Sequence, residues 1–355
     1  MSLEDLRKKI DSLDAEIVRL VADRIKIARE IGGEKSSQGR QVNDWAREKR
    51  VLSHIKALAR GENIDQEVIE SIYQQIITIC RRTQGAEVAF QGETGAYGEE
   101  AAFQFFGPLV TTRPYESLEE VFKATERDEV QFGIIPVENS LEGSISQSYD
   151  LLLDSNLKVC GEIELKVVHC LIANPGARLD SIKRVYSHPQ ALGQCKAFLK
   201  HLDCELIPTY DTAGSVKMIK EKGITDGGAI ASARAAEIYE MKVIAREIED
   251  NPNNFTRFFI LSREDSPPSG NDKTSIVFAV KHRPKALYHF LGELAERDIN
   301  LSKIESRPTR HKPWEYNFYL DLDRHREDKA VQEALARSEH HTLFLKILGS
   351  YPKAK

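Results

Sequence analysis

Residues 3–31 read LEDLRKKIDSLDAEIVRLVADRIKIAREI. Leucine or isoleucine recurs in alternating steps of three and four, which is typical of a helix that packs along one apolar seam. The seam consists of Leu3, Leu6, Ile10, Leu13, Ile17, Leu20, Arg24, Ile27 and Ile31. Arg24 is its one charged member, and a guanidinium is costly to bury without an anion. Either an acidic side chain elsewhere in the protein or an anionic ligand must therefore neutralise it.

The seam belongs to an all-α domain of three helices that we expect over residues 1–85. A first helix of this length is too long for a monomeric domain of this size to cover. Its seam is therefore expected to meet a second copy in an intertwined homodimer or a higher homo-oligomer. Caps and glycines predict helices from Ser2 to Ile31 (ended by Gly32 and Gly33), from Asn43 or Asp44 to Ala59, and from about Asp65 towards Gly85.

The composition is that of an ordinary globular protein with several domains. Of the 355 residues 30% are charged and 41% are hydrophobic, and the net charge of −5 leaves no basic surface for nucleic acid. No apolar run is long enough for a membrane helix or has the pattern of a signal peptide. The five cysteines are odd in number and form no CxxC pair, which favours reduced thiols. We expect a cytoplasmic protein without a nucleic-acid or membrane partner.

From Glu87 the periodicity changes to short apolar strands that alternate with helices, which predicts an α/β domain with a mostly parallel sheet over residues 87–264. Strands are expected at 88–90, 132–135, 167–173, 184–186 and 228–231. A polar linker at 263–273 leads to a βαββαβ pattern over residues 274–355, which indicates a small ferredoxin-like domain.

Besides Arg24, further polar residues of the helical domain recur at helical spacing. On the second helix, three polar residues share one face with the apolar residues that follow them along the helix. On the third helix, a glutamine continues the apolar stripe. The set comprises Arg7, Lys35, Asp44, Arg47, Glu48 and Gln84. With Arg24 counted, its four cations outnumber its two acids by two, which leaves room for a dianion. The alternative is an internal ion-pair network that holds the dimer in register.

In type and spacing this set resembles the active-site residues of the all-helical chorismate mutases, over the first 85 residues. The resemblance implies that Arg24, Arg47 and Lys35, with Arg7 from the other subunit, hold the two carboxylates of chorismate. It also implies that Lys35 and Gln84 donate hydrogen bonds to the ether oxygen. The reaction, a unimolecular rearrangement to prephenate, needs a fixed conformer and positive charge at the breaking C–O bond.

The same resemblance implies that Glu48 and Asp44 lie near the ring hydroxyl of chorismate. The catalytic members would be Lys35, Gln84 and Glu48. One position differs from the family, because Cys80 stands where serine is frequent. A thiol is a weaker hydrogen-bond donor than a hydroxyl.

Several strands of the middle domain lead through small polar residues into a helix. Free amides at helix N-termini suit carboxylates, and such junctions gather at one edge of an α/β sheet. Each junction alone could be an ordinary N-cap, but together they favour a small acid as ligand. The junctions are Gln91–Gly95, Pro136–Ser140, Ser187–Gln190, Asp211–Gly214 and Ser232.

Three segments of this domain, Pro136–Gly143, Ser187–Cys195 and Asn254–Phe258, closely resemble the signatures of prephenate dehydratases. The family has two lobes around a cleft, like a periplasmic binding protein. The resemblance implies that Thr256 donates to, or protonates, the leaving hydroxyl as prephenate loses water and carbon dioxide, and that Arg257 binds a carboxylate or orders the loop.

It further implies a cleft lined by Glu138, Asn139, Ser187, Gln194 and Thr212. His188 is an alternative general acid, although a histidine before proline often only holds a turn. Neither resemblance implies a cofactor or a metal.

Residues 274–352 resemble an ACT domain, a module that senses amino acids. The segment Glu305, Ser306, Arg307 and Pro308 matches the one that borders the phenylalanine site in these dehydratases. Its companion motif usually reads Gly-Ala-Leu and here is Lys285, Ala286 and Leu287, so that a lysine could crowd the site. Feedback by phenylalanine is the implied role, and a domain that only dimerises is the alternative.

Three function hypotheses follow. The first is a bifunctional chorismate mutase and prephenate dehydratase that makes phenylpyruvate and responds to phenylalanine. The second keeps the dehydratase and makes the helical domain a sensor without catalysis. The third is a binding protein for an aromatic acid without any catalytic activity.

Overall fold

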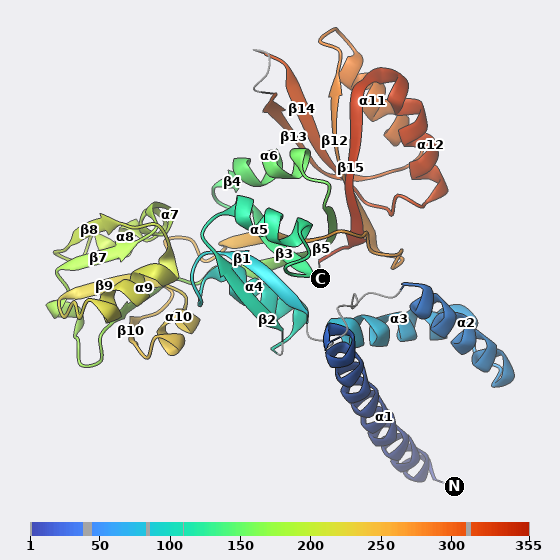
Figure 1. Ribbon diagram of the computed structural model, residues 1–355, viewed down its shortest axis with the longest axis horizontal. Helices are drawn as coiled ribbons and strands as arrows, with labels where there is room; N and C mark the ends of the chain where they lie inside the picture. The colour runs from blue at the N-terminus through green and yellow to red at the C-terminus, as the bar shows by residue number, and fades with distance from the viewer. Residues whose placement is uncertain (1, 38–44, 83–85, 109, 310–313, 355) are drawn as a thin grey trace. The chain divides into compact units, whose positions relative to one another are not determined.

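The computed structural model describes residues 2–37, 45–82, 86–108, 110–309 and 314–354 (Figure 1). The chain divides into two compact units, one of residues 1–87 with 103–111 and one of residues 88–102 with 112–355. In the described part, no helix is both long and apolar enough to cross a membrane.

The first unit contains the three expected helices, α1 (Leu3–Ser37), α2 (Trp45–Gly61) and α3 (Gln66–Arg82). The predicted end of the first helix at Ile31 is wrong, because α1 continues through Gly32 and Gly33. Gly32 is buried one turn after the buried Ala28, and α1 packs against α3. The burial of Gly32 in the folded unit thus goes with a helix that continues despite a propensity cost of about 1 kcal/mol per glycine.

The apolar seam of α1 is open to solvent in the single chain. Its eight leucine and isoleucine side chains are between 46% and 65% exposed. The N-terminal part of α1 runs clear of α2 and α3 (Figure 1). A contiguous apolar stripe of this kind is unusual on a monomer and marks an interaction surface.

Two sheets form the two lobes of the middle part. The first has the strand order β2-β1-β3-β11-β5, with β4 beside β3, and the second has the order β10-β6-β9-β7-β8. The strands of the first are β1 (Glu87–Gln91), β2 (Thr111–Tyr115), β3 (Phe132–Asn139), β4 (Gly143–Ser144), β5 (Lys158–Lys166) and β11 (Phe255–Ser262). Those of the second are β6 (Cys170–Ala173), β7 (Arg184–Ser187), β8 (Glu205–Pro208), β9 (Gly227–Ala231) and β10 (Lys242–Ala245).

Helices follow most of these strands. They are α4 (Tyr97–Phe106), α5 (Leu118–Glu126) and α6 (Ser146–Asp154) in the first lobe and α7 (Pro189–Gln194), α8 (Lys196–Leu199), α9 (Thr212–Glu221) and α10 (Ala233–Ile238) in the second.

The expectation of a mostly parallel sheet is wrong, since both sheets are mixed. In the first, β1 and β3 are parallel, but β11 runs antiparallel to both of its neighbours, β3 and β5. The chain enters the second lobe after β5 and returns from it as β11, which inserts between β3 and β5. Strand β11 therefore links the two lobes and occupies an interior position of the first sheet.

The C-terminal module has the predicted βαββαβ order, with a sheet ordered β13-β14-β12-β15. Its helix-covered face contains Phe278 stacked on Phe290 at 3.6 Å between ring centroids. The opposite face, with Tyr319 and Tyr351, joins the core of the first lobe. The elements are β12 (Asp272–Val280), α11 (Ala286–Ala295), β13 (Leu301–Pro308), β14 (Tyr316–Leu322), α12 (Lys329–Ser338) and β15 (Thr342–Pro352).

Candidate functional site

In the helical unit, Arg24 on α1 meets Cys80 on α3. Nη1 of Arg24 donates to Sγ of Cys80 over 2.7 Å, and the cysteine is 3% exposed. The sulfur thus acts as an acceptor, not as the donor that a serine would supply. A neutral thiol does not compensate the charge of the guanidinium, so this contact leaves Arg24 suited to an anion.

The other predicted residues of this site are only partly covered by the structure. Arg7 and Arg47 lie on helix surfaces exposed in the single chain. Asp44 and Gln84 lie outside the described residues, as do the side chains of Lys35 and Glu48.

A buried hydrogen-bond chain surrounds Thr256, near the start of β11. Nδ2 of Asn139 donates to Oγ1 of Thr256 at 3.1 Å and to Oδ1 of Asn254 at 2.7 Å. Asn254 donates in turn to Oε1 of Gln194 at 2.8 Å. Because Oγ1 of Thr256 accepts the amide proton, its own proton is left to donate to another oxygen.

The hydrogen-bond chain continues to His169, a residue that no sequence pattern predicted. Its Nε2 lies 2.9 Å from Oε1 of Gln194, which already accepts from Asn254, so Nε2 carries the proton. Burial lowers the pKa of His169 and favours this neutral ring. Nε2 of Gln194 is buried and has no partner within the described chain, so it can donate to a ligand. An isolated histidine beside an apolar strand gave no signal in the sequence.

A cleft of about 600 Å³ lies beside this cluster, a suitable size for a small ligand. Asn139 lines it and also belongs to the Thr256 cluster. Two residues with basic side chains, His188 and Lys196, line it from the second lobe. His188 caps α7 as well, where Nδ1 accepts from the amide of Gln190 at 3.3 Å. The cleft thus joins a held hydroxyl to two basic side chains from the opposite lobe.

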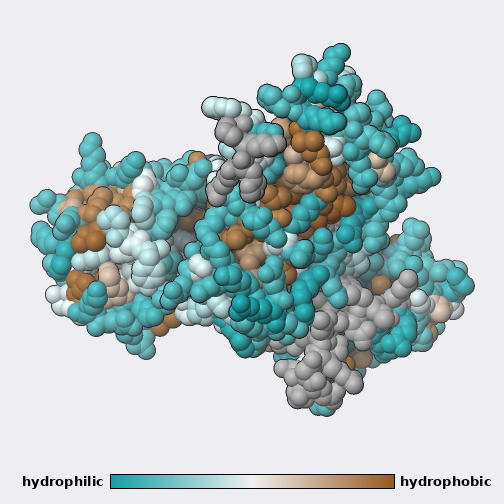
Figure 2. Space-filling view, turned by 45° about the horizontal axis from the view of Figure 1, so that its top comes forward, coloured by the Kyte–Doolittle hydropathy of each residue, from teal (hydrophilic) through white to brown (hydrophobic). Residues whose placement is uncertain are grey.

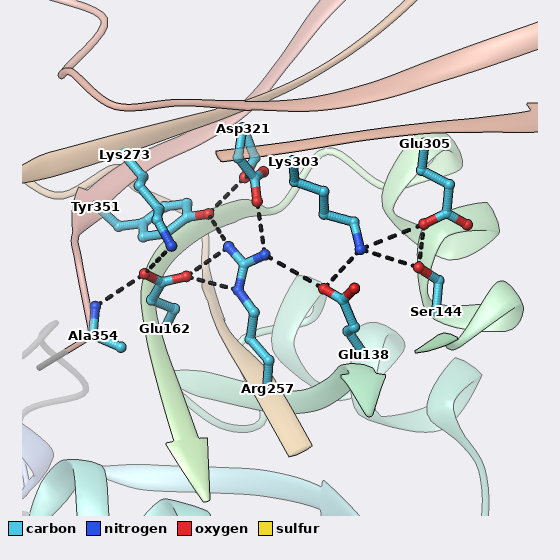
Figure 3. A network of polar contacts seen from close by, with 11 residues as sticks. Glu138, Ser144, Glu162, Arg257, Lys273, Lys303, Glu305, Asp321, Tyr351 and Ala354 are labelled. Carbon is cyan, nitrogen blue, oxygen red and sulfur yellow. Dashed lines mark hydrogen bonds and ion pairs between the residues drawn. The ribbon is translucent and has the colours of Figure 1, made fainter. Parts of the chain in front are cut away.

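Other predicted cleft residues lie elsewhere. Ser187 is buried and donates to the carbonyl of Ile230 over 2.7 Å, and Thr212 begins α9; neither lines this cleft. Glu138 and Arg257 are neighbours of Asn139 and Thr256 in β3 and β11, but their side chains point into a network with the C-terminal module (Figure 3). The structure thus brings Asn139, Gln194 and Thr256 together and separates the others from them.

The C-terminal module contains a pocket of about 190 Å³. Ala286 and Leu287 line it, together with the charged Lys281, Arg283 and Glu315. Hydrophobic side chains gather on the visible surface of this module (Figure 2). The pocket therefore offers apolar walls and charges of both signs, the chemistry that a zwitterionic apolar amino acid requires.

The two predicted effector segments are separate in this chain. None of the residues from Glu305 to Pro308 lines the pocket. On β13, Glu305 accepts from the hydroxyl of Ser144, and Arg307 pairs with Asp150 at 3.0 Å.

Lys285 adopts a φ of +68° at the start of α11. Glycine tolerates this left-handed conformation at little cost, whereas residues with a side chain adopt it rarely. The lysine retains the turn with a strained backbone.

Three family models match the chain in order. They are chorismate mutase type II over residues 6–85, prephenate dehydratase over 88–266 and the ACT domain over 274–340. The bifunctional chorismate mutase/prephenate dehydratase of Aquifex aeolicus (strain VF5) is 38% identical over 359 residues, which cover 99% of this chain and 98% of that protein.

Two solved structures share the fold of the second unit. The prephenate dehydratase of Arthrobacter aurescens in complex with L-Phe is 30% identical with a TM-score of 0.70, covering 75% of this chain and 90% of that one. GqqA, described as a novel type of quorum quenching acylase, is 33% identical with a TM-score of 0.69, covering 75% and 97%. Because one fold can support different chemistries, the match across the full length of the bifunctional relative decides the assignment. The chain belongs to the family of bifunctional chorismate mutase/prephenate dehydratases with a C-terminal ACT domain.

Proposed function

We propose that this protein converts chorismate to prephenate and then prephenate to phenylpyruvate, in the biosynthesis of phenylalanine. The helical part is the isomerase and the two-lobed part is the lyase. The observation that carries the proposal is the buried hydroxyl of Thr256, held by Asn139 at the edge of a cleft of about 600 Å³. It stands in a chain whose three parts match the three domains of the bifunctional family in order.

In the dehydratase, Thr256 gives its proton to the leaving hydroxyl of prephenate. The bond between the ring and its carboxylate breaks, and its electron pair completes the aromatic ring as the C–O bond breaks. Water and carbon dioxide leave, and no cofactor is needed because aromatisation drives the elimination. The free N–H of Gln194 and the ammonium of Lys196 are suited to the carboxylates of the substrate. Ser187 and Thr212 support the second lobe around them.

In the mutase, Arg24, Arg47 and Lys35 hold the two carboxylates of chorismate, with Arg7 from a second copy. Lys35 and Gln84 stabilise the charge on the ether oxygen, while Glu48 and Asp44 lie near the ring hydroxyl. Cys80 supports the site by accepting a hydrogen bond from Arg24.

The protein acts as a homodimer or a higher homo-oligomer, in which the exposed seam of α1 packs against the seam of another copy. This assembly covers the apolar stripe and supplies Arg7 to the neighbouring site. The five free cysteines support a place in the reducing cytoplasm.

Purified protein supplied with chorismate is expected to consume it and to release phenylpyruvate, with prephenate as the intermediate. Chorismate and prephenate are each given as the starting substrate, and both products are followed separately by absorbance and chromatography. Turnover of prephenate without turnover of chorismate would indicate that the helical part is a sensor without catalytic activity. Binding of prephenate without turnover of either compound would contradict the enzyme assignment.

Phenylalanine is the proposed effector, bound in the pocket beside Ala286 and Leu287. Saturating phenylalanine is expected to raise the melting temperature, because a ligand at a hundred times its dissociation constant stabilises the bound state by about 2.7 kcal/mol. Differential scanning fluorimetry with and without phenylalanine measures the shift. Arg283→Ala, at the pocket wall, should reduce the shift, whereas Lys329→Ala, on the exposed side of α12, should keep it. No change in melting temperature or in dehydratase activity would exclude this effector.

A further inference from the structure

The catalytic pair of the proposed dehydratase has a charged pair directly behind it. Thr256 on β11 lies opposite Asn139 on β3, and the adjacent Arg257 lies opposite Glu138. Since successive residues of a strand point to opposite faces, the hydroxyl and amide lie on one face and the two charges on the other. Whatever holds the charged pair therefore also sets the position of the catalytic pair.

The guanidinium of Arg257 is held both by Glu162 on β5 of its own sheet, with Nη2 at 2.6 Å, and by the C-terminal module (Figure 3). Nη1 donates to Asp321 on β14 at 2.7 Å, and Nη2 donates to the hydroxyl of Tyr351 on β15 at 3.1 Å. Nε donates to Glu162 at 2.8 Å, and Glu162 also pairs with Lys273 at 2.9 Å. The Arg257 side chain is 10% exposed, and its two close carboxylate partners, Glu162 and Asp321, are 6% exposed or less. Glu138 is a third and more distant partner at 4.0 Å. Counted with Lys273 and Lys303, three cations face three carboxylates, which leaves no excess positive charge for a substrate carboxylate.

Glu138 is held by the same module from β13. Nζ of Lys303 lies 2.7 Å from its carboxylate and donates to Oγ of Ser144 at 3.0 Å. Ser144 in turn donates to Glu305, and it pairs with Glu138 across β3 and β4. The end of β3 that carries Asn139 is therefore held to β13 through Glu138. In the same way, the end of β11 that carries Thr256 is held to β14 and β15 through Arg257.

The backbone ladder at this point is irregular. The pairing of β11 with β3 shifts register between Arg257 and Phe258, whose partners are Glu138 and Pro136. Proline supplies no amide to the ladder, and a bulge bends the strand and re-aims its side chains. The ladder around Thr256 is therefore regular on the β5 side and interrupted on the β3 side, next to Arg257.

We propose that Arg257 and Glu138 are positioning residues through which the C-terminal module keeps Oγ1 of Thr256 on the amide of Asn139. The inference rests on the proposed dehydratase function and replaces the expectation that Arg257 and Glu138 bind prephenate. A shift of β13 or β14 reaches the catalytic hydroxyl by this route without any contact with substrate.

Kinetics of the full chain with Asp321→Asn and with Tyr351→Phe test the proposal. Asp321→Asn removes the negative charge that pairs with Arg257, Tyr351→Phe removes the hydroxyl that accepts from it, and neither residue lines the cleft. For prephenate, kcat is expected to fall about tenfold with KM within about twofold of the wild type, because positioning and not binding is lost. Mutase activity should stay unchanged and report on folding. Asp323→Asn is the matched control, since Asp323 follows β14 but pairs with Lys353 at 3.2 Å.

Arg257→Lys separates positioning from substrate binding. A lower kcat at constant KM supports the proposal, since lysine keeps the charge but loses the forked geometry. A higher KM at constant kcat would show a substrate ligand and overturn it, and so would normal kinetics in both Asp321→Asn and Tyr351→Phe. Wild-type activity on prephenate is measured first, because its absence refutes the dehydratase function itself. If the wild type is active, the kinetics of the variants test only the positioning role of Arg257 and Glu138.

Discussion

Replacing Thr256 with alanine is expected to lower prephenate dehydration by about 10²–10⁴-fold, the range that a positioned proton donor contributes. The reason is that Oγ1 of Thr256 already accepts a hydrogen bond at 3.1 Å from Asn139, which lines the cleft, so that the proton of the threonine is left to donate. Chorismate consumption should continue at the wild-type rate. Prephenate should therefore accumulate when chorismate is the substrate, which chromatography of the reaction measures directly.

Two further substitutions at this position control for shape. Thr256→Ser keeps the hydroxyl and should retain a substantial part of kcat. Thr256→Val keeps the shape without the hydroxyl and should match the alanine variant. Near-normal dehydration by the valine variant would show that another group, such as His188, donates the proton.

Arg24→Ala is expected to abolish chorismate turnover almost completely, with a loss of about 10²–10³-fold or more, as for other single groups that stabilise developing charge. The substitution removes the cation from the seam and leaves Cys80 without the donor it meets at 2.7 Å. Prephenate supplied from outside should still be converted to phenylpyruvate. Initial rates with each substrate measure the two effects on one preparation.

Arg19→Ala is the matched control on the same helix. Arg19 is 66% exposed, and its ion pairs with Glu16 and Asp23 are both long, at 3.9 Å, and contribute little to stability. This variant should keep both activities. If Arg24→Ala retained full mutase activity, Arg24 would instead be a structural ion-pair residue.

The helical seam could be predicted from the sequence because its period is local. The end of α1 could not, since the helix-propensity cost of Gly32 and Gly33 is offset only in the folded unit, where Gly32 is buried. The same holds for β3, which extends beyond the predicted Ile135 to Asn139 because β11 pairs with it there. Non-local contacts decided both boundaries.

The candidate site, too, could be predicted from local motifs but not where distant parts of the chain meet. Thr256 and Asn139 belong to motifs that the sequence displays, and they do meet. Glu138 and Arg257 stand in the same motifs, but strand alternation places them on the opposite face, and only the folded chain brings Asp321 and Lys303 to them. His169 stands in no motif, and its connection with Gln194 arises from tertiary packing alone.

The interior position of β11 has a consequence for the order of events during synthesis of the chain. When a ribosome has made β1, β2, β3 and β5, the place between β3 and β5 is still empty, and it stays empty until the whole second lobe has emerged. The strand that fills this place carries Thr256, and its closure is a contact of long sequence separation, which forms slowly. Throughout that interval the unfinished sheet exposes the unpaired backbone edges of β3 and β5. The hydroxyl of Thr256 thus comes into place only at the step that closes the sheet.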